Sequence, residues 1–329
     1  MKVICSSEES LYRPHAVRWR QRMEMMEPLG DTVVLLPCSM KKPYSNSKSH
    51  QKFRKLTRSY QELIVTSPFG ICPRELENTF PIQSYDVSTT GSWSQDEIEK
   101  TGELIAKYCE GKKIVANLAG GYLESCEAYV DDFVNVCEDG RPTSPDSLYN
   151  LRMELKNHQK VNRREKTLHE LRSIAKFQFG ENGDKFIPDN VKTKGMYHKR
   201  ILSNGKQLAL LNKDHGLYRL NLPGGEILKE LGIHIVEIDF DLTTNTVFAP
   251  GIVKADHKII PNDEVVVVKE DTVVGVGKAI MTGYEMEECR NGIGVKLKHK
   301  IKKTKKSNTK NKIKTFINAF INSINILKN

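Results

Sequence analysis

Blocks of apolar and polar residues alternate along the first 150 residues and predict short strands between helices. Three short apolar runs have the pattern of buried strands: TVVLLP (32–37), LIVTSP (63–68) and KKIVANL (112–118). Such continuous runs are typical of strands covered on both faces. Helices are predicted at about 12–26, 50–60, 94–109 and 121–137. This alternation predicts an α/β domain, residues 1–150, with a parallel sheet flanked by helices.

The pattern changes after residue 150. A helical stretch at 162–180 precedes short mixed strands, separated by turn signals at Asn204-Gly205, Asp214-His215-Gly216 and Pro223-Gly224-Gly225. Together they predict a small α+β domain, residues 151–246. Valine-rich strands with regularly spaced glycines then predict a small β-barrel at 247–303.

The remaining residues, 304–329, are predicted to form a basic tail with an amphipathic helix. Six apolar residues share one helical stripe: Ile313, Phe316, Ile317, Phe320, Ile321 and Ile324. The stripe needs a surface to cover it. We favour the protein itself or a partner subunit over a membrane, because the basic residues precede the helix rather than line it.

Most of the net charge of +10 comes from this tail. Residues 300–329 contain nine lysines and no acid, so the rest of the chain has 42 basic and 41 acidic residues. A basic tail is typical of nucleic-acid contact, although many such tails are only solvated. The first domain is also polarised: residues 11–74 carry twelve Lys/Arg and four acids, and residues 75–150 carry five and fifteen.

Several classes of protein are excluded by missing motifs. The seven cysteines form no CxxC pair, so neither a zinc site nor a disulfide framework is expected. No P-loop and no Rossmann glycine motif follows a strand, and no cofactor is expected. The apolar runs are too short to cross a membrane and no signal pattern opens the chain. We therefore expect a cytoplasmic protein without membrane contact.

Polar residues follow two of the predicted strands. Cys38 lies directly after TVVLL, in the loop PCSMKKPYSNSKSH (37–50), and Ser67 lies directly after LIVT, in a segment that continues to Arg74 and Asp86. Because the carboxyl ends of parallel strands share one edge, both loops are predicted to enclose a pocket for a polar ligand with anionic parts. The structural alternatives stay open: Cys38 as a small buried residue and His50 as a helix cap.

Three regions resemble known families. PCSMKKPYSNSKSH, with SLYRPHAVRWRQR before it and PRELENTFPIQSYDV after it, is similar to the central domain of archaeosine synthase. LRSIAKFQFG and HGLYRLNLPGGEIL resemble the accessory domain that precedes PUA in archaeal tRNA-guanine transglycosylases. APGIVKAD, IIPNDEVVVV and VGVGKAIMTGYEM resemble a PUA domain, an RNA-binding module.

The resemblance implies a transferase of the amidinotransferase type that modifies tRNA. In that family, an amino-acid nitrogen, from lysine, is added to the nitrile of 7-cyano-7-deazaguanine in the dihydrouridine arm. The implied partners are tRNA, L-lysine and a radical-SAM subunit. The family's long N-terminal transglycosylase-like barrel is absent from this sequence, so a short, split form with a separate transglycosylase-like polypeptide is expected.

Roles for individual residues follow from this chemistry. The nitrile carbon would react either through a covalent thioimidate with Cys38 or directly with a neutral amine held close to it. Helix N-terminus amides, Ser39, Ser47 or Ser49 would stabilise the developing negative nitrogen, and His50 or Tyr44 would donate a proton. Lys41 and Lys42 would contact phosphate, and Glu75 or Glu77 would bind the ammonium of lysine. The other residues predicted at the substrate are Pro43, Ser67, Arg74 and Asp86, and those predicted at RNA are Gly251, Lys254 and Lys278.

Two other functions compete with this one. The chain would be a non-catalytic tRNA-binding subunit of a split transglycosylase system, or a nucleobase glycosidase, since the layout of its first domain is loosely similar to uracil-glycosylase folds.

Overall fold

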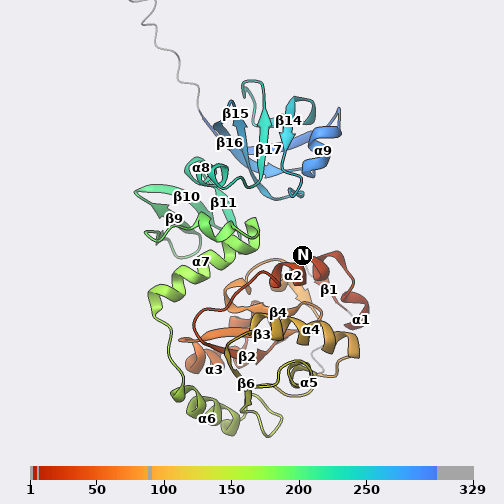
Figure 1. The fold of residues 1–329 in the computed structure, drawn as a ribbon, viewed down its shortest axis with the longest axis vertical. Helices are drawn as coiled ribbons and strands as arrows, with labels where there is room; N and C mark the ends of the chain where they lie inside the picture. The colour runs from red at the N-terminus through yellow and green to blue at the C-terminus, as the bar shows by residue number, and fades with distance from the viewer. Residues whose placement is uncertain (1–2, 6, 88–90, 302–329) are drawn as a thin grey trace, which may run out of the picture.

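The computed structural model describes residues 3–5, 7–87 and 91–301, and the predicted tail at 304–329 lies outside these ranges. Three units follow one another along the long axis of the molecule (Figure 1): an α/β unit, a small α+β unit and a β-rich unit. The predicted fold class is confirmed.

The α/β unit is built on a five-stranded sheet of order β4-β3-β2-β6-β7. At its centre, β2 (Thr32–Pro37) runs parallel to β3 (Gln61–Thr66) and to β6 (Lys113–Ala116). β7 (Val134–Asn135) extends the parallel order beside β6. β4 (Gly70–Pro73) is antiparallel to β3 and forms the other edge. The predicted parallel sheet is therefore present, with one antiparallel edge strand.

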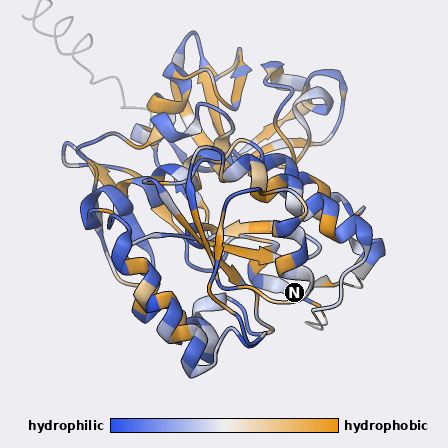
Figure 2. Cartoon of the chain, turned by 60° about the horizontal axis from the view of Figure 1, so that its bottom comes forward, coloured by the Kyte–Doolittle hydropathy of each residue, from blue (hydrophilic) through white to orange (hydrophobic). Residues whose placement is uncertain are grey.

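Side-chain alternation along β2 divides the core of this unit between two faces. Val33 and Leu35 belong to one buried cluster, and Val34 and Leu36 belong to another. Successive side chains of a strand point to opposite faces, so both faces of the sheet must be covered. Figure 2 shows the strands as largely hydrophobic ribbons enclosed by helices. The first cluster includes residues of α2 (Pro14–Met23) and α4 (Gln95–Tyr108), and the second includes residues of α3 (Lys48–Thr57) and α6 (Pro145–Glu154).

The helix predicted at 121–137 is much shorter than expected. α5 covers only Gly121–Glu127, and β7 follows it as a strand paired with β6. Val134 is β-branched, which favours a strand once a neighbouring edge is free to pair with it. A separate two-stranded parallel sheet pairs β1 (Val3–Ile4), near the start of the chain, with β5 (Tyr85–Asp86). The short helix α1 (Ser7–Ser10) follows β1.

The α+β unit opens with α7 (Arg163–Phe179), as predicted. An antiparallel sheet of order β11-β10-β9-β8 follows. The predicted turn at Asn204-Gly205 joins β9 to β10, and both residues have positive φ, 48° and 77°, as a tight hairpin turn requires. The strands are β8 (Lys192–Lys194), β9 (Lys199–Ser203), β10 (Lys206–Leu211) and β11 (Tyr218–Leu220).

The prediction of a turn at Pro223-Gly224-Gly225 is wrong, because these residues lie in the first turn of α8 (Leu222–Glu230). Proline is accepted in the first helical turn, where its missing N–H has no partner to lose. The two glycines allow the helix to approach the sheets. A Cβ at Gly224 would lie 2.3 Å from the Leu208 carbonyl oxygen, and a Cβ at Gly225 would lie 2.6 Å from a methyl carbon of Val276.

The third unit is a six-stranded mixed sheet of order β13-β17-β16-β15-β12-β14. β12 (Ile235–Ile238) precedes the domain boundary predicted at residue 247, yet it pairs with two strands of this sheet. The valines of β15 are buried, as expected for a barrel-like core. The other elements are β13 (Thr246–Phe248), β14 (Ile252–Ala255), β15 (Glu264–Lys269), β16 (Thr272–Ala279), α9 (Gly283–Glu288) and β17 (Ile293–Lys300).

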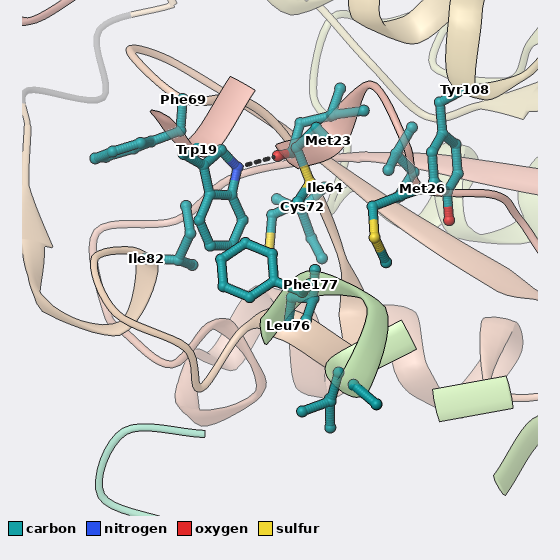
Figure 3. Packing of buried hydrophobic residues seen from close by; sticks show 14 of the residues in the cluster. Trp19, Met23, Met26, Ile64, Phe69, Cys72, Leu76, Ile82, Tyr108 and Phe177 are labelled. Atoms are coloured by element: carbon teal, nitrogen blue, oxygen red, sulfur yellow. Dashed lines mark hydrogen bonds between the residues drawn. The ribbon is translucent and has the colours of Figure 1, made fainter. Parts of the chain in front are cut away.

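The first two units share one hydrophobic core, shown in Figure 3. Trp19 of α2 donates its indole N–H to the Ile71 carbonyl oxygen at 2.9 Å. Phe177 of α7 packs against this indole, with 4.9 Å between the ring centroids. Arg22 donates to the Phe177 carbonyl oxygen at 2.7 Å. A tryptophan that is 1% exposed at this junction ties the position of α7 to that of the sheet.

Candidate active site

A cavity of about 500 Å³ lies at the carboxyl edge of the parallel sheet, next to β2 and β6. Ligands of α/β sheets bind at this edge, and the volume is that of a typical small-molecule site. Five segments of the chain enclose it. Its lining consists of Pro37, Cys38, Ser49, Phe53, Gly91, Ser92, Ala119, Gly120, Tyr122, Gly140, Pro142 and Thr143.

Cys38 supplies the thiol of this lining. Its backbone N–H donates to the Val65 carbonyl oxygen at 3.1 Å, which fixes the residue one step beyond β2. Its Sγ lies 3.2 Å from the hydroxyl oxygen of Tyr122 on α5. Burial, and then the neighbouring thiol, raise the pKa of Tyr122, so the phenol keeps its proton and can donate to a thiolate.

The first turn of α3 supplies the second polar wall. Ser47 caps the helix, because its Oγ accepts the His50 N–H at 3.2 Å. The Oγ atoms of Ser47 and Ser49 lie 3.1 Å apart, and Ser49 faces the cavity. The first turn of α3 therefore borders the same space as Cys38, and the partial positive charge of a helix N-terminus favours negative charge nearby.

Arg74 does not line the cavity. It is 7% exposed and forms ion pairs with Glu62 and, at 2.9 Å, with Glu77. The reason is the direction of β4. Since β4 runs back along β3, with Leu63 opposite Pro73, the chain delivers Arg74 near the start of β3 and not at its carboxyl end. The pocket between Cys38 and Arg74 that the sequence predicts is therefore not formed by these two loops.

The Arg74 guanidinium also fixes the state of His50. Its Nη2 lies 2.8 Å from His50 Nδ1, and a guanidinium can only donate, so Nδ1 accepts and the imidazole proton is on Nε2. Burial, and then the adjacent guanidinium, hold the pKa of His50 well below its usual range. His50 is fully buried and absent from the cavity lining, so it orients the α3 turn and does not face a ligand there.

Tyr44 and Lys42 are also internal. The hydroxyl groups of Tyr44 and Tyr85 lie 2.8 Å apart, and Tyr85 also bonds to Thr66. The Lys42 Nζ lies 3.9 Å from the Tyr85 ring centroid, buried and without a hydrogen-bond partner. Burial lowers the pKa of this lysine. The two adjacent lysines therefore differ: Lys41 is exposed and can reach phosphate, whereas the ammonium of Lys42 is covered.

The other residues predicted at the substrate lie apart from the cavity lining. Ser67 donates to Glu97 of α4. Glu75 accepts from Gln61 at 3.2 Å and lies 3.5 Å from His169 of α7. Four further positions complete the set. Glu77 accepts from the Ser45 N–H, and Ser39 donates to the Lys41 carbonyl oxygen. Asp86 lies in β5, and Pro43 precedes Tyr44 at the start of a short 3-10 turn.

The residues predicted at RNA lie in the third unit. Lys254 is exposed on β14, and Lys278 is half-buried on β16. Gly251 ends a short 3-10 turn, and a Cβ there would lie 2.4 Å from the Phe240 ring, so this glycine has a packing role.

Tyr122 was not predicted, and neither was the role of Gly120 and Gly121. A Cβ at Gly121 would lie 2.6 Å from the Trp93 ring, and one at Gly120 would lie 2.9 Å from the Gly91 carbonyl oxygen. The glycine pair thus lets residues 91–93 pack against the start of α5 and shape the cavity wall. The available signal was their position: they follow a predicted strand at the carboxyl edge of the sheet.

Within the described ranges, no helix combines the length and apolarity needed to cross a membrane. In the same part of the chain, no three His, Cys, Asp or Glu side chains gather closely enough to hold a metal ion.

Three family profiles match the chain. A domain of unknown function (DUF5591) matches residues 16–155, the patch-forming domain C2 of tRNA-guanine transglycosylase matches 169–232, and the PUA domain matches 238–301. The fold and the cavity thus define an α/β protein with a carboxyl-edge pocket, followed by a C2 and a PUA domain.

Curated relatives and a solved structure agree with this architecture. Archaeosine synthase of Methanocaldococcus jannaschii is 36% identical over 320 residues, which cover 91% of this chain and 54% of the relative. The alpha subunit of archaeosine synthase from Thermococcus kodakarensis is 35% identical over 320 residues, 90% of this chain and 55% of the relative. The crystal structure of AF0587, a protein of unknown function, has a TM-score of 0.70 and 30% identity, and the match covers 87% of this chain and 100% of that one.

This chain is homologous to archaeosine synthases over about nine tenths of its length. It spans about half the length of the curated relatives it matches.

Proposed function

We propose that this protein acts on tRNA in archaeosine formation and adds the side-chain amine of lysine to the nitrile of 7-cyano-7-deazaguanine. The observation that carries the proposal is the pairing of the Cys38 thiol with the Tyr122 hydroxyl inside a carboxyl-edge cavity of about 500 Å³. The similarity to archaeosine synthases over about 90% of the chain supports the choice of substrate.

The reaction proceeds in two redox-neutral steps. The Cys38 thiolate attacks the nitrile carbon, a C–S bond forms, one C–N π bond breaks and the nitrogen takes up a proton, which gives a thioimidate. The neutral amine of lysine then attacks the same carbon. Collapse of this adduct breaks the C–S bond, returns the electron pair to sulfur and releases a proton from the amine nitrogen, which leaves an amidine.

Each residue near the cavity has a role in this scheme. Tyr122 donates to the sulfur when it carries negative charge, before attack and after collapse. Ser49 and the first turn of α3 stabilise negative charge on the nitrile nitrogen. His50 and Arg74 are positioning residues that hold this turn in place.

The partners follow from the same proposal. tRNA is bound in part by the PUA domain, with Lys254 exposed on β14, and lysine is the co-substrate. The name of the Thermococcus kodakarensis relative, a subunit alpha, supports a partner polypeptide. The proposed partners are a transglycosylase-like polypeptide and a radical-SAM subunit that releases the free amidine in the cytoplasm. In this proposal the α/β unit is the catalytic domain, the α+β unit is the accessory domain and the third unit is the PUA domain, which begins at β12 and not at the predicted residue 247.

Transfer of radiolabelled lysine to tRNA that carries 7-cyano-7-deazaguanine tests the proposal. Wild-type protein, with any partner subunit supplied, should label the tRNA, and Cys38→Ser should abolish labelling. Ser39→Ala is the matched control, because Ser39 is half-buried in the adjacent position and absent from the cavity lining. Binding of tRNA without any labelling would contradict the enzymatic function and favour a tRNA-binding subunit. Release of free base would favour a glycosidase.

A further inference from the structure

The loop between β8 and β9 exposes two large apolar side chains side by side. Met196 is 88% exposed and Tyr197 is 70% exposed, and both lie at the tip of this hairpin. Single exposed apolar residues are common, but two adjacent ones on a loop form a contiguous exposed apolar surface, and such surfaces often bind a partner. Figure 1 shows the sheet that carries this hairpin between the α/β unit and the PUA sheet. The hairpin is thus separate in the fold from the Cys38 cavity.

The tip is held in a defined shape. Gly195 has a φ of 106°, and a Cβ there would lie 2.4 Å from the His198 carbonyl oxygen, so only glycine fits this turn. The Lys213 N–H, from the loop after β10, donates to His198 Nδ1 at 3.4 Å. The Lys213 ammonium lies 4.8 Å from the centroid of the Tyr197 ring. One face of the ring is thereby bound to a cation that keeps it in place.

The surroundings of the tip are strongly basic. The segment from residue 192 to residue 200 contains four exposed cations and no acid, and all of them lie on the two strands of the hairpin: Lys192, Lys194, Lys199 and Arg200. Cations on both sides of an exposed aromatic ring are the combination that single-stranded nucleic acid requires, because bases stack on the ring while phosphates contact the cations.

A small cavity lies beside the tip of the hairpin. Its volume is about 200 Å³, and it runs from Tyr197 to Glu75 of the α/β unit. Amide side chains line its walls, which gives hydrogen-bonding partners for the edge of a base. The complete lining is Glu75, Asn78, Ile174, Met196, Tyr197, Lys199, Leu211, Asn212, Lys213 and Gly216.

We propose that the β8–β9 hairpin binds an unpaired stretch of the RNA substrate, with one base stacked on Tyr197 and the flanking phosphates on the lysines and Arg200. The choice of tRNA as that RNA rests on the proposed function. The stacking surface itself rests on the exposure, charge and geometry of the hairpin.

Equilibrium binding of an unmodified tRNA transcript to the full chain tests this inference without any transfer reaction. Tyr197→Ala should weaken binding about 5- to 100-fold, the range expected for loss of one stacked base, whereas Tyr197→Phe should stay within about twofold of wild type. Tyr149→Ala is the matched control, because Tyr149 is 60% exposed on α6, where no comparable basic segment flanks it. This control should leave the Kd unchanged.

The cations are tested by the salt dependence of the same binding. A Lys192→Ala, Lys194→Ala double variant should lower the slope of log K against log salt by about 1 to 2, as two lost phosphate contacts predict. An unchanged slope, a Tyr197→Ala Kd within twofold of wild type, or an equal loss in Tyr149→Ala would overturn the inference. Tight tRNA binding without lysine transfer would contradict the proposed enzymatic function but not the inference about the hairpin.

Discussion

Two groups of polar residues lie near the central sheet, and they differ in whether they face one another or a cavity. Around Arg74, the charged groups bind one another: two carboxylates and His50 use the donors of one guanidinium, and little of the group is exposed. Around Cys38, a thiol, a phenol and Ser49 face open space at the carboxyl edge. The buried cluster around Arg74 supports the fold, and the cluster that faces the cavity is the candidate site.

The largest expected effect on stability comes from removing the cation of the buried Arg74 cluster. Arg74→Met leaves Glu62 and Glu77 buried without their cation, which should lower the free energy of unfolding by about 3–5 kcal/mol in urea denaturation. Lys41→Met, at an exposed position, is the control and should change stability by less than about 0.5 kcal/mol. If Arg74→Met lowers the free energy of unfolding by less than about 1 kcal/mol, these ion pairs do not stabilise the fold.

Glu264 is a third buried carboxylate, and within the described residues it forms no ion pair with a lysine, arginine or histidine. Glu264 accepts the Leu220 N–H at 2.8 Å, and burial raises its pKa to about 7. Between the ordinary value of 4.5 and this value, the folded protein holds the proton and the unfolded chain does not. Its contribution to stability is therefore present at low pH and lost as the pH rises through about 7.

The pH dependence of unfolding measures this contribution. From about pH 4.5 to about pH 8, wild type should lose about 3 kcal/mol more stability than Glu264→Gln, whose amide keeps the acceptor without the charge. If stability depends on pH in the same way in both proteins, then the folded state does not raise the pKa of Glu264, and this prediction is wrong.

The smallest predicted effect is in the open group. Tyr122→Phe removes the hydroxyl that lies 3.2 Å from Cys38 Sγ. Loss of a hydrogen bond to a charged atom should slow lysine transfer about 10- to 100-fold in single-turnover assays. Stability should change little, because the ring keeps its contact with Trp93. An unchanged transfer rate would remove Tyr122 from the mechanism and leave the cavity without a donor to the sulfur.

Local patterns predicted much of the fold and part of the site. The central strand at 32–37 and Cys38 directly after it follow from a short buried run and from the rule for ligand sites in α/β sheets. Arg74 could not be placed, because the position depends on β4 running back along β3, a pairing that the four residues Gly70–Pro73 do not specify alone. Tyr122 became a site residue only through its contact with Cys38, 84 positions away.

The most direct test of the account is intact mass spectrometry of the protein incubated with nitrile-bearing tRNA in the absence of lysine. We predict a covalent adduct that maps to Cys38, is absent from Cys38→Ser, and disappears when lysine is added. If wild-type protein transfers lysine while no adduct forms, and Cys38→Ser retains full turnover, the thiol in this cavity is not the nucleophile and the account is contradicted.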